Sequence, residues 1–168
     1  MIYHLQTSVL DTHAKVVAHQ VNCMGVMGSG VASQVKRKYP EAYKAYKSYC
    51  DQNEHYRIGM LGSVQIVPVS FMPDGEPRIF VANLFAQFDY GRSKYTVYTN
   101  YTALRQCLHK LRDFSVEHEA IIALPWHIGC DRGNGDWDGH VYPMIQSILS
   151  DREVLLCEYP PKEIYGAY

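Results

Sequence analysis

The sequence has almost no net charge, since it contains sixteen Lys and Arg residues and seventeen Asp and Glu residues. Its isoelectric point is near 6.7. A protein without a basic surface has no general attraction for duplex nucleic acid or an anionic membrane, and we expect neither as a partner. The sequence also lacks a run approaching the ~18 apolar residues of a membrane span, and its start, MIYHLQTSVLD, lacks the features of a signal peptide. We therefore expect a soluble, cytoplasmic protein.

Cysteine and histidine occur without the spacings that bind metals. The five cysteines form an odd number and include no C-x-x-C pair, so neither a zinc site nor a disulfide framework is predicted. The eight histidines show no H-x-x-x-H spacing. We therefore predict no metal, no cofactor and reduced cysteines.

Sequence repeats, low-complexity runs and long linkers are absent as well. With 168 residues, 47% of them hydrophobic and 20% charged, the chain has the size and composition of one globular domain with its own core. We assign this domain to residues 1–159 and expect a monomer. The remaining residues, 160–168, form a C-terminal tail that is either disordered or folded back over the sheet.

Hydrophobic patterning predicts strands that alternate with helices from end to end. The strands are expected at 1–6, 15–22, 62–69, 78–85, 119–124 and 153–159. The helices are expected from Ser29, a candidate cap, from Pro40, over 98–114, and from near Tyr142 to Leu149. This order predicts a three-layer α/β/α fold with a mixed, largely parallel central sheet and helices on both faces.

Two glycine-rich loops follow strands in this pattern. GVMGSG comes after the second strand and IGCDRGNGD after the fifth, and ligands of such sheets bind at the carboxyl ends of the strands. Glycines let backbone N–H groups approach an anion, and the N-terminus of a following helix adds partial positive charge. Together the loops predict a diphosphate cradle; the alternative is two tight turns without a ligand. Neither loop fits G-x-G-x-x-G or the P-loop, so the standard nucleotide-binding motifs receive weak support.

Three segments of the chain resemble the macro domain, a fold that binds ADP-ribose. They are AHQVNCMGVMGSGVASQVKRKYPEAYKAYKSYC, VANLFAQFDYG and ALPWHIGCDRGNGDW, and the resemblance runs over about residues 1 to 159. Within that family the chain is most similar to the yeast-type ADP-ribose-1''-phosphate phosphatases and their phage and bacterial relatives. The resemblance implies ADP-ribose or ADP-ribose-1''-phosphate as the ligand, with the distal ribose near Asn22 and the diphosphate between the two loops.

The residues expected to contact this ligand come from three parts of the chain. They are Asn22, Gly25, Val26, Met27, Gly28, Ser29 and Gly30 from the first loop, Ile128, Gly129, Cys130, Asp131, Arg132 and Gly133 from the second, and Tyr90 from the FDYG segment. Tyr90 is expected to act as a lid or to stack on the ligand. Arg132 is expected to contact phosphate and Asp131 to pair with Arg132, although an ordinary exposed ion pair is the default interpretation.

The chain departs from the family pattern after its first and fourth strands, and its second loop carries Asp131 and Arg132 where relatives have glycine and an apolar residue. Many macro domains carry an aspartate after the first strand that binds the adenine amine, whereas this chain has Ser8, Val9 and Leu10 there. Adenine selectivity then rests on backbone groups or is relaxed. Relatives that remove ADP-ribose from glutamate or nucleobases carry a lysine after the fourth strand, where this chain has Gln87. A covalent lysyl mechanism is therefore disfavoured, although Lys94 lies in the same loop.

Hydrolysis of a phosphate ester needs a group that orients or deprotonates water, and His19 is the first candidate. Its position resembles that of a histidine in the yeast-type phosphatases. On a strand, residues 19 and 22 face opposite sides, so His19 and Asn22 reach one spot only if the strand is bulged or bent. The alternative is a core histidine that hydrogen-bonds to a neighbouring strand.

Asp136, at the end of the second loop, is the second catalytic candidate because a carboxylate there could position water. An aspartate directly before a helical stretch is also a common N-cap. Cys23 and Cys130 lie in the two loops, but no base is identifiable beside them, so a nucleophilic cysteine is not predicted.

These residues favour an enzyme that hydrolyses ADP-ribose-1''-phosphate to ADP-ribose and phosphate. Two alternatives stay open: a non-catalytic module that reads ADP-ribose, and a hydrolase that removes ADP-ribose from a modified macromolecule. Gln87 in place of lysine disfavours the hydrolase of macromolecules, and His19 favours the phosphatase over the reader.

Overall fold

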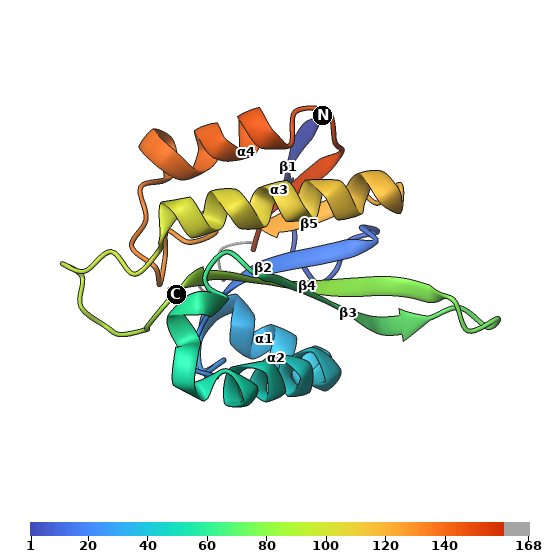
Figure 1. The fold of residues 1–168 in the computed structure, drawn as a ribbon. Coiled ribbons are helices and arrows are strands. Elements are labelled where there is room, and N and C mark those ends of the chain that lie inside the picture. The colour runs from blue at the N-terminus through green and yellow to red at the C-terminus, as the bar shows by residue number, and fades with distance from the viewer. Residues whose placement is uncertain (160–168) are drawn as a thin grey trace, which may run out of the picture.

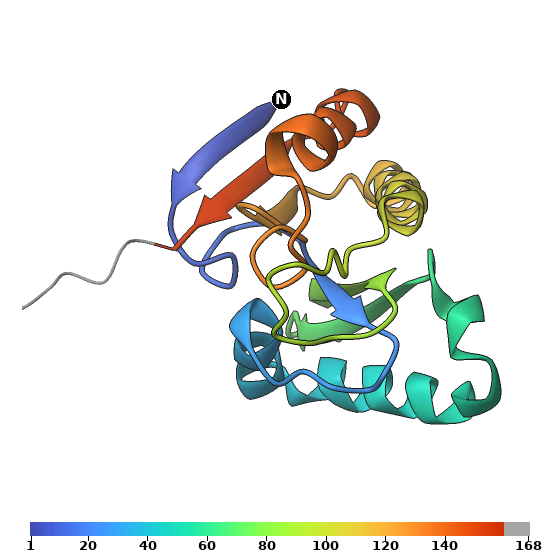
Figure 2. The ribbon, with the colours of Figure 1, turned by 90° about the vertical axis from the view of Figure 1, so that its left-hand side faces the viewer.

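The computed structural model describes residues 1–159, and the tail assigned to 160–168 lies outside the described residues. One six-stranded sheet carries helices on both of its faces (Figure 1, Figure 2). The strands are β1 (Ile2–Gln6), β2 (Val16–Asn22), β3 (Val64–Phe71), β4 (Pro77–Gln87), β5 (Ile122–Pro125) and β6 (Val154–Glu158). The helices are α1 (Gly30–Lys38), α2 (Pro40–Gln52), the 3₁₀ segment η1 (Glu54–Met60), α3 (Tyr101–Glu117), the π-helical segment η2 (Trp137–Val141) and α4 (Tyr142–Ile148). The predicted three-layer fold is confirmed.

The strand order of the sheet brings distant segments to one edge. The order is β1-β6-β5-β2-β4-β3, with β3 antiparallel to β4 and the other neighbouring pairs parallel. Because β2 lies between β5 and β4 and runs parallel to both, the loops that follow these three strands leave the sheet at the same edge. The two glycine loops therefore become spatial neighbours.

The central strand β2 is buried on both faces. Val16 and Ala18 pack in the cluster formed with α3 and α4, whereas Val17 and Val21 pack in clusters that include residues of α1 and α2. Figure 1 shows the same layering, with α3 and α4 above the sheet and α1 and α2 below it. Burial on both faces explains why β2 has a near-continuous apolar run instead of an alternating pattern.

Two prolines set helix boundaries as predicted. Pro40 opens α2 directly after Tyr39, and Pro143 lies in the first turn of α4, which begins at Tyr142. The sequence interpretation missed η1 and η2, because segments of one or two irregular turns carry no helical periodicity. None of the helices within residues 1–159 has the length and apolar character that crossing a membrane requires.

Candidate functional site

Three adjoining cavities form a groove along the carboxyl ends of β2, β4 and β5, where the loops that follow these strands gather on one side of the molecule (Figure 2). We name them the Tyr90 lobe, the His19 lobe and the Ser8 lobe, with volumes of about 310, 340 and 300 Å³. Neighbouring lobes share lining residues: Arg132 lines the first two and Trp126 the last two. The three lobes therefore adjoin one another in a row along this edge of the sheet.

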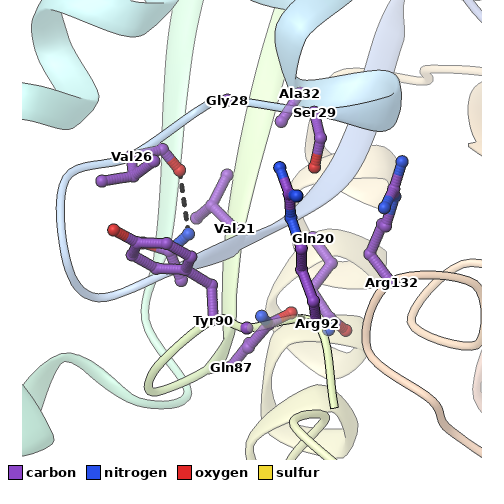
Figure 3. A pocket seen from close by; sticks show the side chains of 12 residues that line it. Gln20, Val21, Val26, Gly28, Ser29, Ala32, Gln87, Tyr90, Arg92 and Arg132 are labelled. Atoms are coloured by element: carbon purple, nitrogen blue, oxygen red, sulfur yellow. Dashed lines mark hydrogen bonds between the residues drawn. The ribbon is translucent and has the colours of Figure 1, made fainter. Parts of the chain in front are cut away.

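Asn22 ties the first glycine loop to the end of β2. Its Nδ2 donates to the Val26 carbonyl at 2.8 Å, shown as the dashed line in Figure 3. Its Oδ1 accepts from the Met24 amide at 2.9 Å and from the Tyr46 hydroxyl at 2.8 Å. Tyr46 is fully buried in α2, so the loop is anchored to a rigid element. Asn22 thus shapes the loop while lining the Tyr90 lobe.

The N-terminus of α1 faces the groove. Ser29, the candidate cap, makes no side-chain capping hydrogen bond, so the first-turn amides of α1 keep their hydrogen-bonding capacity. Gly30 has a φ of +61°, a conformation that residues with a Cβ rarely adopt. Both residues line the His19 lobe. Free amides and the partial positive charge of the helix N-terminus suit an anion.

The second glycine loop is held against β2 and the segment before α3. Thr99 Oγ1 donates to the Gly129 carbonyl at 2.6 Å, and the Tyr98 and Thr99 amides donate to the Gly133 carbonyl at 2.8 and 3.1 Å. Gly129 has a φ of +74°, and a Cβ there would lie 2.8 Å from Gln20 Oε1. Close packing against Gln20 and Thr99 therefore requires glycine in this loop, besides any contact with a ligand.

His19 is buried in the floor of the His19 lobe. Its Nε2 lies 2.7 Å from Oδ1 of Asn83, its partner on β4. Asn83 Nδ2 donates to the Ala42 carbonyl and to Gln65 Oε1, so Asn83 Oδ1 is an acceptor and His19 Nε2 carries the proton. His19 Nδ1 is then an acceptor without a hydrogen-bond partner in the described chain. Burial lowers the pKa of His19 from 6.5 to about 4, against a smaller raising effect of the Asn83 hydrogen bond.

The bulge that His19 and Asn22 require is present, because the pairing of β2 with β4 shifts register between Val21 and Asn22. His19 nevertheless lines the His19 lobe and Asn22 lines the Tyr90 lobe. The two side chains therefore face neighbouring lobes instead of a single spot.

Asp136 occupies a capping position. Its Oδ1 accepts from the Gly139 amide at 3.0 Å, and its Oδ2 lies 3.3 Å from His140 Nδ1. These two contacts hold the pKa of the Asp136 carboxyl below its usual value. Asp136 lines none of the three lobes. The capping alternative is confirmed, and the structure gives no support to Asp136 as a catalytic group.

Asp131 has a different neighbour from the one expected. Its Oδ1 lies 3.9 Å from His127 Nδ1, and no Asp131–Arg132 ion pair occurs within the described part of the chain. Both partners of the observed pair are largely exposed, so the contact adds little stability. The Arg132 side chain instead points along the groove towards α1 (Figure 3).

Three of the expected contact residues do not line the groove. Gly25 packs against Lys47 and Cys50 of α2, Met27 is buried in the core, and Cys130 is half-buried and packs against the main core cluster. Burial raises the pKa of the Cys130 thiol to about 12, which disfavours a nucleophilic thiolate at neutral pH. The expected contact residues that do line the groove are Asn22, Val26, Gly28, Ser29, Gly30, Tyr90, Ile128, Gly129, Asp131, Arg132 and Gly133.

Three polar residues of the Tyr90 lobe were not expected to contact the ligand: Gln20, Gln87 and Arg92. Gln20 Nε2 donates to Gln87 Oε1 at 3.0 Å and to Thr99 Oγ1 at 2.8 Å, which leaves Gln20 Oε1 without a partner among residues 1–159. Gln20 could have been found from sequence, because an amide inside a buried apolar strand needs polar partners. Arg92 carried no such signal, since its direction depends on how a long loop folds.

The fold and the groove together define a class, an α/β domain that binds an anionic ligand at the carboxyl edge of its sheet. Its donors are helix and loop amides and two arginines. No group of three or more His, Cys, Asp or Glu side chains suited to a metal ion occurs in residues 1–159.

Sequence comparisons identify relatives of this class, although no family model matches. The chain is 35% identical over 85 residues to an ADP-ribose 1''-phosphate phosphatase of Debaryomyces hansenii, a match that covers 48% of each chain. It is 30% identical over 155 residues to an uncharacterized 17.5 kDa protein of Enterobacteria phage T4, covering 90% of this chain and 91% of that protein. It is 26% identical over 161 residues to a DNA ADP-ribosyl glycohydrolase of Mycobacterium tuberculosis, covering 96% of this chain and 42% of that protein.

Solved structures agree with these sequence matches. A macrodomain protein from Streptomyces coelicolor has a TM-score of 0.74 at 25% identity, covering 95% of this chain and 99% of that chain. The macrodomain of Mycobacterium tuberculosis DarG has a TM-score of 0.74 at 24% identity, covering 96% and 99%, and shows the same fold. The chain belongs to the macro domain family, as the three sequence segments predicted.

Proposed function

We propose that the chain binds ADP-ribose-type ligands in the groove and hydrolyses ADP-ribose-1''-phosphate to ADP-ribose and phosphate. The observation that carries the proposal is the unpartnered, buried Nδ1 of His19, whose ring lines the His19 lobe together with the N-terminus of α1 and the second glycine loop. The name of the Debaryomyces hansenii relative supports the substrate. Because that match covers about half of each chain, its activity enters only as part of this proposal.

In the proposed chemistry His19 is the general base that accepts a proton from the attacking water. Water attacks phosphorus, His19 Nδ1 accepts the proton that the water loses, and the bond between phosphorus and the 1'' oxygen breaks. The released oxygen takes a proton from solvent, which yields ADP-ribose. The amides of α1 and the loops, together with Arg132, stabilise negative charge on the phosphoryl oxygens.

A hydrolase that removes ADP-ribose from DNA is the second candidate. It is favoured by the Mycobacterium tuberculosis relative, whose match spans 96% of this chain. Against it stands Gln87, at the position where the resemblance leads one to expect lysine. The Gln87 amide donates to the Asp89 carbonyl at 2.7 Å and cannot act as a nucleophilic amine. A reader module would use the same groove and lack turnover.

The test combines calorimetric titration with ADP-ribose and a phosphate-release assay on ADP-ribose-1''-phosphate. We expect His19→Ala to lower the release rate about 100-fold or more, the contribution of a general base, and to retain ADP-ribose binding. His13→Ala, at an exposed histidine outside the groove, is the matched control and is expected to leave both unchanged. Binding without phosphate release by the unaltered chain would exclude the phosphatase and favour the reader or the DNA-directed hydrolase.

We further propose that the chain acts as a monomer in the cytoplasm, with this small molecule as its partner instead of duplex nucleic acid or a membrane. The near-zero net charge of −1 supports this proposal. Light scattering of the purified protein is expected to give the mass of one chain, and a dimer mass would contradict it.

A further inference from the structure

Two arginines from different loops converge on the Tyr90 lobe. Arg92 belongs to the loop after β4 and Arg132 to the second glycine loop, and both line this lobe. Figure 3 shows both guanidinium groups pointing towards the N-terminus of α1, with Ser29 beside Arg92. Neither arginine has a salt-bridge partner within residues 1–159, where the ionic contacts involve other side chains. Two unpaired guanidinium groups beside a helix N-terminus form a strong anion-binding arrangement.

The backbone on both sides of Arg92 is held in place. A Cβ on Gly91 would overlap the Tyr98 side chain, so the loop packs tightly there. On the other side, the Ser93 amide donates to the Tyr98 hydroxyl at 3.3 Å, and Asn134 Nδ2 donates to the Ser93 carbonyl at 2.8 Å. Asn134 also donates to the Thr96 carbonyl at 2.8 Å, which links this loop to the second glycine loop. The backbone on both sides of Arg92 is therefore anchored beside the Tyr90 lobe, which the Arg92 side chain lines.

Gln20, which lines the Tyr90 lobe together with the two arginines, has a side-chain oxygen without a hydrogen-bond partner in the described chain. This oxygen, Oε1, is buried, and the Gln20 side chain lines the His19 lobe as well. The Tyr90 lobe thus combines two cationic side chains with the neutral polar side chains of Gln20, Asn22 and Gln87, which fits a phosphorylated sugar.

The two arginines differ in what they can reach. Arg132 lines the Tyr90 lobe and the His19 lobe, whereas Arg92 lines the Tyr90 lobe alone. The His19 lobe contains the N-terminus of α1 and the second glycine loop, the proposed diphosphate cradle. The Tyr90 lobe contains Asn22 and forms one end of the groove. Arg92 therefore approaches the distal end of a ligand from the Tyr90 lobe, whereas His19 approaches it from the His19 lobe. A phosphoryl group that meets both residues must lie at the junction of the two lobes, which Gln20 and Arg132 line.

We propose that Arg92 is a specificity-determining residue, which binds a phosphoryl group on the distal sugar and selects a ligand that carries this group over the same ligand without it. Arg132, which lines both lobes, binds the same phosphoryl group and the diphosphate as well. Asn134 acts as a positioning residue that keeps Arg92 directed into the lobe. The inference rests on the proposed function, because the distal sugar and diphosphate are those of an ADP-ribose-type ligand.

The test compares ADP-ribose-1''-phosphate with ADP-ribose. Arg92→Gln is expected to lower kcat/KM for the phosphorylated ligand about 10- to 100-fold, the effect of losing a charged hydrogen bond, through KM more than through kcat. The Kd for ADP-ribose should change less than about threefold. Arg92→Lys should give a kcat/KM between those of the unaltered chain and Arg92→Gln, since lysine keeps the positive charge and loses the two-pronged geometry of the guanidinium group.

Asn134→Ala should also reduce the preference for ADP-ribose-1''-phosphate over ADP-ribose. Lys94→Gln, which removes a charge from the same loop outside the groove, is the matched control and should change neither quantity.

The outcomes separate this inference from the function on which it rests. If the unaltered chain binds both ligands without hydrolysis, equilibrium Kd values replace kcat/KM, and a preference for the phosphorylated ligand that Arg92→Gln abolishes supports the inference. Equal losses for both ligands in Arg92→Gln, no loss, or the same loss in Lys94→Gln would overturn the inference. The proposed function would still stand in these cases, because the unaltered chain would still bind ADP-ribose. Absence of ADP-ribose binding by the unaltered chain would overturn the proposed function and this inference with it.

Discussion

His19 shows how neighbours decide the chemistry of one side chain. The sequence offered two interpretations, a catalytic histidine and a core histidine hydrogen-bonded to the next strand. The structure combines them: Nε2 donates to Asn83 within the core, and this bond leaves Nδ1 as an unpartnered acceptor on a ring that lines the His19 lobe. A histidine with that tautomer accepts a proton and does not bind phosphate as a cation.

The first prediction concerns the pH dependence of stability. The pKa of His19 is about 4 in the folded chain and near 6.5 when unfolded, so the unfolded chain binds the proton first as the pH falls. Neutral His19 therefore contributes fully to the free energy of unfolding above pH 6.5, and this contribution is lost as the pH falls from 6.5 towards 4. The loss of unfolding free energy over this range is about 3 kcal/mol. Urea denaturation between pH 7 and pH 4 should therefore show a smaller loss of unfolding free energy in His19→Gln than in the unaltered chain.

The control for this experiment is His13→Gln. His13 is exposed and should leave the slope of unfolding free energy against pH unchanged. Parallel slopes for the unaltered chain and His19→Gln would show that the buried ring does not carry the effect.

The second glycine loop is positioned by contacts with elements far away in the sequence. Thr99 links it to β2, since Thr99 Oγ1 donates to the Gly129 carbonyl and accepts from Gln20 Nε2. Gly133 has no space for a Cβ, which would overlap Thr99 Oγ1. The loop is therefore a preformed wall of the groove, and its glycines are needed for packing before any ligand arrives.

The second prediction removes this link. Thr99→Val keeps the shape of the side chain and loses both hydrogen bonds, which should cost about 1 to 3 kcal/mol of unfolding free energy and weaken ADP-ribose binding. Thr102→Val, on the exposed side of α3, is the matched control and should change the unfolding free energy by less than about 0.5 kcal/mol. Denaturant titration and calorimetry measure the two effects. Unchanged binding in Thr99→Val would mean that the loop does not depend on Thr99 for its position.

The five cysteines lie in different parts of the domain, and their burial shows how far the core extends through the molecule. Cys23, Cys50, Cys107 and Cys157 are buried, and Cys130 is half-buried. Burial raises the pKa of each thiol, to about 12 for Cys23, Cys107 and Cys130 and to about 11 for Cys157. Thiolate, the reactive form, is therefore scarce throughout the folded molecule.

The third prediction follows for a thiol-specific reagent at about pH 8. The folded protein should react slowly, with Cys130 first because it is the most accessible, and all five thiols should react in guanidinium chloride. Cys130→Ser should remove the early phase. Rapid reaction of several thiols in the folded protein would contradict the burial described for the sheet and its helices.

The sequence predicted the layers, the strands and the two glycine loops because these depend on local periodicity and on residues that set backbone angles. Pro40 and Pro143 marked helix boundaries correctly for the same reason, since proline acts on its own turn. Asp136 was ambiguous because one residue type serves both capping and catalysis, and the hydrogen bond from the Gly139 amide decided between them.

Composition and spacing were thus sufficient for the fold class and for the edge of the sheet where the groove lies, because hydrophobic burial and glycine geometry are readable along the chain. The family came from the resemblance of three segments to macro domains. Folding alone decided how the polar groups beside the groove are partnered. The unpartnered His19 Nδ1 and Gln20 Oε1 follow from the hydrogen bonds to Asn83 and Thr99, and Asn134 anchors the loop that carries Arg92. Each of these partners lies many residues away, and no local pattern along the chain records such a contact.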